Sequence, residues 1–353
     1  MWHDNSRSGV GVAIDQESLL VSLSGIVTTR SLINVLEQIV IKKGQISPLP
    51  SGLNLVVDLS KVNVVMPDGA VSLVCLCAAL MTKKMKHICS PTAIYLRRPP
   101  EQVLTYLTRI GFFTLMSVKA NLLGWGDFVR LEDQWRERYR RERIHGAFDK
   151  GFENGNRPLV WPMQIVGQKA SQSSYRHFEN DCQQLVNSAA DHFEKLFSSS
   201  HFNFDKADMH AFLQSIYELY MNVYEHSYSW GLTMVHARPN YGTFVCCYDI
   251  GVGFKEGLSG SPNVKERIET DHQAIKWALI EGHSRKVGGS GQGLNDVENF
   301  VSERKGTIEI RSGECLLQKT SENANWQDHR VPWFPGAQID LFVPVRAGGI
   351  GGL

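Results

Sequence analysis

Several features that would place a protein in a familiar class are missing from this chain of 353 residues. No apolar run approaches the roughly 18 residues that a membrane-spanning helix needs, so we expect no membrane association. The first residues are polar and contain no apolar signal core, and together these absences predict a cytoplasmic protein. Lysines and arginines (37) nearly balance aspartates and glutamates (36). The overall charge therefore argues neither for nor against nucleic acid.

The cysteines provide neither a metal framework nor a disulfide framework. Their number, seven, is odd and their positions are scattered. No CxxC pair or Cys/His cluster has the ligand spacing of a zinc site. Cys75, Cys77, Cys246 and Cys247 lie in apolar runs. This placement favours buried free thiols.

The first part of the chain, 1–125, alternates strand and helix signals. Apolar runs typical of strands, and helical patterns between them, occur at 19–23, 31–42, 53–59, 70–84, 93–96 and from Pro100 onward. Strands that alternate with helices predict an α/β domain. Asp68 directly precedes the second helical pattern and is placed to cap that helix.

A change of composition separates this region from the rest of the chain. Between 126 and 158, a segment dense in charge (132–143) precedes one rich in glycine and asparagine (146–158), which is typical of a linker. Arginines and aromatics interleave in the charged segment, as they do in nucleic-acid patches. A solvated connecting helix, whose glutamates partly neutralise the arginines, fits the same residues. We favour this helix, and nucleic acid is not an expected partner.

The second part, 159–346, has the pattern of a mixed sheet covered by helices on one face. Strand signals occur at 158–166, 232–237, 243–250, 306–312 and 337–344, and helical patterns at 173–198, 206–227, 271–282 and from 293 onward. The last residues, 347–353, are expected to form a flexible tail. The two parts together indicate the α/β class, of the α+β sandwich type.

Three short blocks in the second part carry candidate chemistry, and the first lies in a helical pattern. Glu218 and Asn222 are four residues apart and therefore share one face of a helix. An amide oxygen on that face can hold Mg²⁺, while the carboxylate orients or deprotonates a water or hydroxyl. An ordinary amphipathic helix with polar residues in solvent is the alternative.

The second block ends a strand. Asp249 follows an apolar run and precedes Gly251 and Gly253. A carboxylate at this position can accept a hydrogen bond from the amino group of adenine, and the glycines allow close approach to the backbone. A capping aspartate in a turn is the alternative.

The third block, 288–294, is rich in glycine and leads into a helical pattern. Its free backbone N–H groups and the positive end of the helix suit a phosphate. Lys286 lies just upstream, where it either reaches phosphates or is solvated. The block lacks the Gly-Lys-Ser/Thr of a P-loop and the preceding strand of a Rossmann fingerprint. A flexible surface loop is the alternative.

The order and spacing of the three blocks resemble the Bergerat-fold (GHKL) ATP-binding domain of gyrase, Hsp90 chaperones, histidine kinases and MutL. The similarity covers about 160–345. It implies that Asn222 binds Mg²⁺, that Glu218 is the general base, and that Asp249 with Gly251 and Gly253 contacts adenine. The lid over the phosphates would comprise Gly289, Gly291, Gly293 and Leu294. In the closing strand, Ala337 stands where the family usually has threonine, so one hydroxyl contact is missing.

The first part of the chain resembles a STAS domain, as found in anti-sigma-factor antagonists. The similarity rests on the runs 56–62 and 107–113 and on the Asp68-Gly69 pair before a helix. Such antagonists carry a phosphorylatable serine where this chain has Asp68. Asp68 is thus either a mimic of the phosphorylated state or a helix cap, and we favour the cap.

These resemblances imply a bacterial signalling protein that binds ATP and Mg²⁺. The activity implied is that of an ATPase or an anti-sigma-type serine protein kinase, gated by the STAS-like domain and its protein partner. The alternative is a non-catalytic ATP-gated switch or scaffold in a multi-gene stress or phage-defence system. A homodimer is compatible with these features. Histidine-kinase phosphoacceptors are not expected, because His177 and His192 lack the following proline.

Overall fold

The computed structural model divides the chain into two compact units, Met1–Arg157 and Pro158–Leu353. The structure describes residues 8–14, 18–45, 53–82, 84–85, 91–113, 115–116, 129–131, 159–166, 187, 204–238, 240–259, 264, 267–280 and 293–345. The charged segment 132–143, the linker 146–158, His177, His192 and the tail 347–353 lie outside these ranges.

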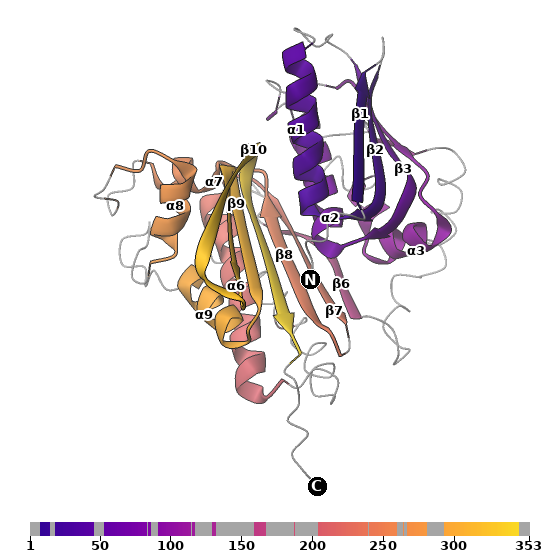
Figure 1. Cartoon of the computed structure of the whole chain (residues 1–353). Helices are drawn as coiled ribbons and strands as arrows, with labels where there is room; N and C mark the ends of the chain where they lie inside the picture. The colour runs from indigo at the N-terminus through magenta and orange to yellow at the C-terminus, as the bar shows by residue number, and fades with distance from the viewer. Residues whose placement is uncertain are drawn as a thin grey trace, which may run out of the picture. The chain divides into compact units, whose positions relative to one another are not determined.

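The first unit is built on a five-stranded sheet with the strand order β1-β2-β3-β4-β5 (Figure 1). Its elements are β1 (Ser8–Ile14), β2 (Ser18–Val27), α1 (Thr29–Gln45), β3 (Asn54–Val65), α2 (Pro67–Met81), β4 (Ile94–Arg97), α3 (Glu101–Arg109) and β5 (Val129–Leu131). β1 is antiparallel to β2, and the other neighbours are parallel. The mixed sheet with its helices confirms the expected α/β class for this unit.

Helix α2 is the most buried of the helices described in the first unit. Its side chains from Ala70 to Leu80 are buried in an unbroken run, which explains why its sequence is apolar on all sides. Proline at the first position supplies a backbone already set for a helix. Gly69 is required because a Cβ there would collide with the backbone of Val27.

Asp68 caps a helix, but not the helix that the sequence suggested. Because α2 begins at Pro67, Asp68 lies inside its first turn, and the N-cap residue is Met66. The carboxylate instead accepts a hydrogen bond from the backbone N–H of Thr29, 2.7 Å away, at the start of α1. The Thr29 hydroxyl lies 2.9 Å from that of Ser72 on α2. Asp68 therefore joins the first turns of α1 and α2.

The second unit contains a five-stranded sheet with the order β6-β7-β8-β10-β9. Its elements are β6 (Leu159–Val166), α6 (Lys206–His226), β7 (Gly231–Arg238), β8 (Gly242–Asp249), α7 (Gly253–Leu258), α8 (Asp271–Ala278), α9 (Gly293–Glu303), β9 (Thr307–Thr320) and β10 (Asn323–Pro344). Buried side chains of α6, α8 and α9 pack on alternate residues of the strands, so these helices cover one face of the sheet (Figure 1). This arrangement confirms the α+β class.

One detail of the second sheet differs from the mixed sheet that we expected. Every pairing among its described strands is antiparallel. β8 and β9 run in the same direction, but β10 lies between them and opposes both. The helices between β8 and β9 therefore form a crossover that is split by the return of β10. The strand signals in the sequence do not predict that β10 lies between β8 and β9.

The buried cysteines agree with the sequence. Cys75, Cys77, Cys246 and Cys247 are buried free thiols, as predicted. Burial raises the pKa of the Cys77 thiol to about 12, so this side chain behaves as an apolar residue at neutral pH. Among the described helices, none is long and apolar enough to cross a bilayer.

A buried ion pair joins α6 to the chain just after α9. Asp208 lies in the first turn of α6, where it forms a capping box with Asp205. It also accepts a hydrogen bond of 2.7 Å from Nη1 of Arg304. Arg304 is 1% exposed, and its guanidinium lies 4.4 Å from the centre of the Phe204 ring. Among the described helices of this unit, α6 and α9 pack most closely, and these contacts connect them.

We predict that Asp68→Ala destabilises the protein by about 1–2 kcal/mol, the usual loss for a helix cap. The backbone N–H of Thr29 would lose its acceptor. Asp68→Asn keeps an acceptor oxygen and should cost much less. Denaturant unfolding measures both variants. Glu101→Ala is the control, because its pair with Arg98 is exposed. Equal losses in the two alanine variants would contradict the capping role.

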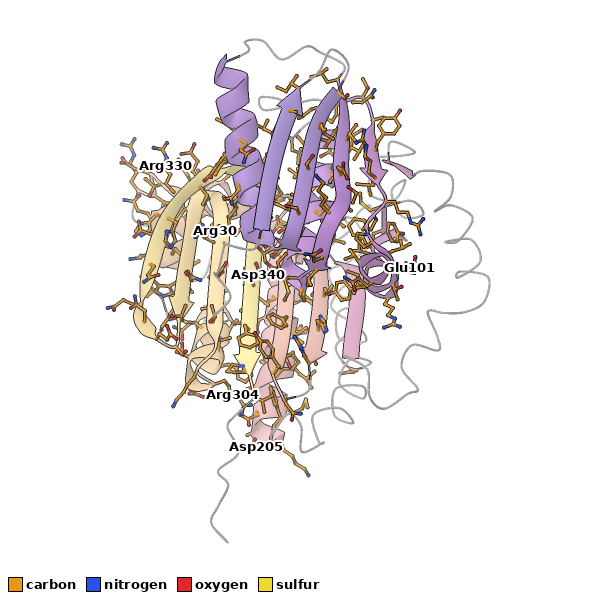
Figure 2. All side chains as sticks on the ribbon, turned by 45° about the vertical axis from the view of Figure 1, so that its right-hand side comes forward. Arg30, Glu101, Asp205, Arg304, Arg330 and Asp340 are labelled. Atoms are coloured by element: carbon orange, nitrogen blue, oxygen red, sulfur yellow. The ribbon has the colours of Figure 1, made fainter. Side chains whose placement is uncertain are left out.

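Arg304→Met should destabilise the second unit by about 3–5 kcal/mol, since it leaves a buried carboxylate without its cation. Thermal and denaturant unfolding measure the loss. Arg330→Met provides a matched control: Arg330 pairs with Glu314 at 3.0 Å, yet its side chain is 86% exposed. The two arginines lie far apart in Figure 2. The control should lose less than about 1 kcal/mol, and a similar loss in both variants would refute the prediction.

Candidate functional site

Among the candidate site residues that the structure describes, Asp249 is the most buried one with an ionisable side chain. It ends β8, and only 5% of its surface is exposed. Its Oδ1 accepts a hydrogen bond of 2.7 Å from the backbone N–H of Gly251. This bond fixes the carboxylate against the turn that follows the strand. A buried carboxylate needs hydrogen-bond donors, and a carboxylate can accept more than one hydrogen bond.

Glycines surround Asp249 where any side chain would collide. A Cβ on Gly251 would clash with the carbonyl of Ser227, and one on Gly231 would lie 3.3 Å from the Cβ of Asp249. A Cβ on Gly336 would clash with the Asp249 carbonyl and approach its Oδ1 to 2.5 Å. Gly336 also has a φ of +77°, which only glycine adopts readily. The backbone of these three glycines therefore packs closely around Asp249, at positions where no side chain fits.

Gly253 begins α7 in a similarly restricted position. Its φ is +75°, and a Cβ would lie 2.6 Å from Oγ of Ser312. That hydroxyl accepts a hydrogen bond of 3.0 Å from the backbone N–H of Phe254 and donates one of 3.1 Å to the carbonyl of Gly336. Ser312 thus fastens the first turn of α7 to β10.

Glu218 lies halfway along α6 and meets the start of α9. Its Oε1 accepts a hydrogen bond of 3.0 Å from the side-chain amide of Gln214, and its Oε2 faces Gly293, where a Cβ would collide with it. Burial raises the pKa of the Glu218 carboxyl above its ordinary value; the bond from Gln214 opposes this shift, and the charges of Asp296 and Glu225 add to it. A raised pKa suits a group that exchanges protons near neutral pH.

Asn222 lies one helical turn beyond Glu218 and is half-buried. The four-residue spacing puts both side chains on the same face of α6, as expected. Further along, Glu225 and His226 end the helix, with Oε2 of Glu225 3.8 Å from Nε2 of His226. The polar side of α6 thus carries one carboxylate, one amide and a weak carboxylate–imidazole pair.

Helix α6 brings the described parts of the three sequence blocks together. Its middle contacts Gly293 through Glu218. Its C-terminal end contacts the Asp249 turn, because the carbonyl of Ser227 accepts a hydrogen bond of 3.1 Å from the N–H of Val252. Glu218 and Ser227 are nine positions apart, which corresponds to about 14 Å of helix. The two contact points are thus separated by the length of a small elongated ligand.

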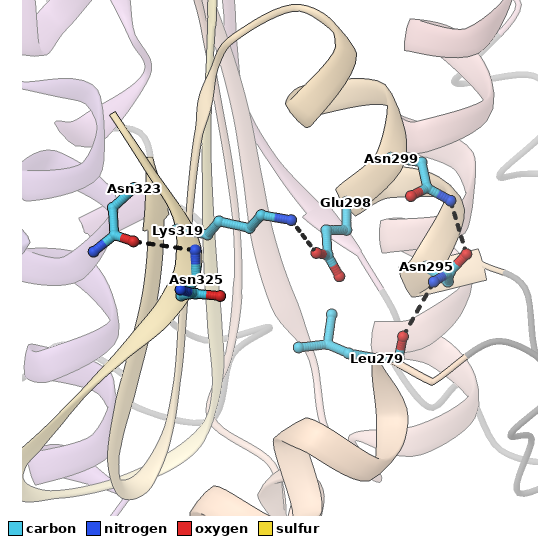
Figure 3. A network of polar contacts seen from close by, with 7 residues as sticks. All are labelled: Leu279, Asn295, Glu298, Asn299, Lys319, Asn323 and Asn325. Carbon is cyan, nitrogen blue, oxygen red and sulfur yellow. Dashed lines mark hydrogen bonds and ion pairs between the residues drawn. The ribbon is translucent and has the colours of Figure 1, made fainter. Parts of the chain in front are cut away.

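The start of α9 is held by its neighbours. Nδ2 of Asn295 donates a 3.2 Å hydrogen bond to the carbonyl of Leu279, the C-cap residue of α8, and Oδ1 of Asn295 accepts one from Asn299 (Figure 3). On the other side, Lys319 of β9 lies 2.7 Å from Glu298. Leu294 is buried in the core of the unit. The first turns of α9 are therefore fixed to both α8 and the sheet.

Three predicted phosphate-binding residues cannot be placed in this site. Lys286, Gly289 and Gly291 lie outside the described residues. Gly293 and Leu294 are the part of that block that the structure describes, and they open α9 as the sequence predicted.

Sequence reasoning did not identify Gly231, Arg311 or Ser312 as parts of the site. Gly231 could have been noticed as a glycine that begins a strand, a position that suggests close packing. The other two lie in an ordinary alternating strand pattern, so only the pairing of β9 with β10 reveals them. Ala337, which the resemblance singled out in the sequence, is the residue of β10 that pairs with Ser312 of β9.

The described residues contain no cluster of three or more His, Cys, Asp or Glu side chains suited to a metal. Mg²⁺ does not require such a cluster, because it often uses one or two protein ligands together with phosphates and water. The Asn222 amide is compatible with that type of coordination.

Comparisons with known proteins give weak structural similarities. No protein-family model matches the sequence, and no curated protein matches it. The anti-sigma factor antagonist SpoIIAA in its unphosphorylated form is 11% identical, with 39% of this chain and 97% of that chain covered at a TM-score of 0.23. An uncharacterized DUF3478-family protein with a SpoIIAA-like fold, from Shewanella loihica, is 12% identical, with 37% and 90% covered at a TM-score of 0.21. Similarity at this level supports no inference about function.

Proposed function

We propose that the second unit binds ATP together with Mg²⁺ and that this binding controls a protein partner. The observation that carries the proposal is the buried Asp249 carboxylate, held by the N–H of Gly251 and bordered by glycines. A hydrogen-bond acceptor at the end of a strand, bordered by glycine backbone, matches the 6-amino group and flat edge of adenine. Guanine presents an oxygen at that position and would be repelled.

The two contact points along α6 support a placement for the phosphates and for Mg²⁺. With adenine at Asp249, the phosphates lie toward the start of α9, whose partial positive charge attracts anions. Asn222 lies between the two ends and would hold Mg²⁺ through its amide oxygen. Mg²⁺ supplies charge neutralisation for the phosphates when bound. The negative charges of Asp296 and Glu225 near Glu218 make this neutralisation necessary.

Glu218 is the residue that decides between a catalytic and a non-catalytic protein. In a catalytic protein its carboxylate accepts a proton from the attacking oxygen, which belongs to water in an ATPase and to a partner's serine in a protein kinase. The raised pKa of Glu218 and its place at the start of α9 favour this role. A non-catalytic switch, in which occupancy alone is the output, is the alternative from the sequence.

The first unit is the proposed partner-binding part, as the STAS resemblance implies. Asp68 stands where such antagonists carry serine, and its carboxylate already accepts a hydrogen bond from Thr29 inside the fold. This hydrogen bond supports a helix cap rather than an exposed mimic of a phosphorylated serine. In this proposal, regulation comes from ATP occupancy of the second unit and not from phosphorylation at position 68.

Asp249→Asn should weaken ATP binding about tenfold or more, the usual effect of losing a hydrogen bond to a charged group. The asparagine oxygen still accepts the bond from Gly251, so the turn should persist. Isothermal titration with a non-hydrolysable ATP analogue and Mg²⁺ measures the change. In this variant, the corresponding guanine analogue should no longer bind more weakly than the adenine analogue. Asp328→Asn, on the exposed part of β10, is the control. Unchanged ATP affinity in Asp249→Asn would refute the adenine assignment.

Glu218→Gln should abolish phosphate release or phosphoryl transfer while ATP binding persists, because the amide keeps the shape beside Gly293 but cannot accept the proton. In the unaltered protein, turnover should fall as the pH drops through a pKa above 4.5, since the Glu218 carboxyl is raised from that value. Glu225→Gln should keep turnover and move this fall to a slightly lower pH, because it removes one raising charge. Saturable ATP binding without turnover in the unaltered protein would favour the non-catalytic switch.

A further inference from the structure

The strands β9 and β10 are matched irregularly next to Asp249. Between the pairs Ser312–Ala337 and Cys315–Arg330, β9 advances three residues and β10 advances seven. The additional residues of β10 form a bulged segment that includes Pro332 and Pro335, which cannot donate to the sheet. Such bulges re-aim the chain near functional sites. This bulge delivers Gly336 to the Asp249 carboxylate.

A single buried arginine holds both ends of the bulged segment. Nη2 of Arg311 donates a 2.8 Å hydrogen bond to the carbonyl of Pro332, and Nη1 donates one of 3.2 Å to Oε1 of Gln338. Its guanidinium also lies 4.9 Å from the centre of the Phe334 ring. Arg311 is 3% exposed. The rigid fork of a guanidinium can make these contacts together, whereas an ammonium cannot.

The position of Arg311 in the sheet connects it directly to the site. In the sheet register, Gln338 of β10 lies between Arg311 of β9 and Tyr248 of β8. Tyr248 immediately precedes Asp249, and its hydroxyl hydrogen bonds with Asp340 of β10. Because side chains alternate along a strand, Arg311 and Tyr248 lie on the face of the sheet opposite Ser312 and Asp249.

We propose that Arg311 is a positioning residue for the adenine end of the site, acting through the sheet from its opposite face. The inference rests on the proposed nucleotide site. Arg311 fixes the bulge, and the bulge fixes Gly336. Gly336, with the Ser312 hydroxyl on its carbonyl, packs closely against the Asp249 carboxylate. A small change of the bulge therefore moves the boundary of the adenine site without touching the nucleotide.

The test compares Arg311→Met with Arg330→Met in the full chain. Both replace an arginine of the same hairpin, but Arg330 is exposed and paired only at the surface. The first readout is the affinity for a non-hydrolysable ATP analogue with Mg²⁺. The second, measured without nucleotide, is the NMR signal of the backbone amides of Gly251 and Gly336. The amide signals report the geometry beside Asp249, which a uniform loss of stability would not change.

Arg311→Met should weaken nucleotide binding about tenfold or more, as expected when a binding residue shifts by a fraction of an ångström. It should also move both amide signals, whereas Arg330→Met should alter neither readout. If Arg311→Met does not fold, Arg311→Lys replaces it; the lysine keeps the charge but can satisfy only part of the fork, so it should show a smaller change in the same direction.

The outcomes separate this inference from the proposed function. Unchanged affinity and unchanged amide signals in a folded Arg311 variant would overturn the positioning role while ATP binding by the unaltered protein still stands. If the unaltered protein binds no ATP, the proposed function fails. The amide signals then decide alone: a shift supports control of the Asp249 turn by Arg311, and no shift overturns it.

Discussion

The packing of α6 against the antiparallel sheet is the constraint on which the second unit depends. One side of this helix contributes Phe212, Ile216, Leu219 and Val223 to the core, where they meet alternate residues of the strands. The same burial presents the opposite side, with Glu218 and Asn222, to the remaining elements of the unit. Since the helix is held at its start by the buried pair of Asp208 and Arg304, its rotation about its own axis is restricted.

The end of α6 then determines the turn after β8. The Ser227 carbonyl accepts a backbone bond from Val252 and leaves no room for a side chain at position 251. Asp249 is thus enclosed by the helix end, the start of β7 and the bulge of β10. A carboxylate in such an enclosure has few degrees of freedom, which is the condition for selecting one hydrogen-bond donor over another.

The two units use acidic residues in different ways. In the first unit, the Asp68 carboxylate accepts a backbone bond from Thr29 and serves to join two helices. In the second, the Asp249 carboxylate also accepts a backbone bond, and the backbone of three glycines packs closely around it. The contrast shows why a partly or fully buried aspartate alone does not mark a site. The difference lies in the elements joined: Asp68 connects two helices, whereas Asp249 lies among glycines at the end of a strand.

The sequence by itself determined the local elements and the residue types of the candidate site. Periodicity located α6, α9 and most strands, because apolar spacing reflects which face is buried. The spacing of Glu218 and Asn222 predicted their shared face for the same reason. β1 escaped notice because its two glycines weaken a strand signal.

The tertiary structure alone decided how these elements pair. It inserted β10 between β8 and β9, assigned Asp68 to the neighbouring helix α1, and brought Gly336 and Ser312 to the Asp249 turn. Each of these outcomes depends on contacts between residues far apart in the chain. Local propensity carries no information on such contacts, because strand register and bulges are selected by the packing of the whole sheet.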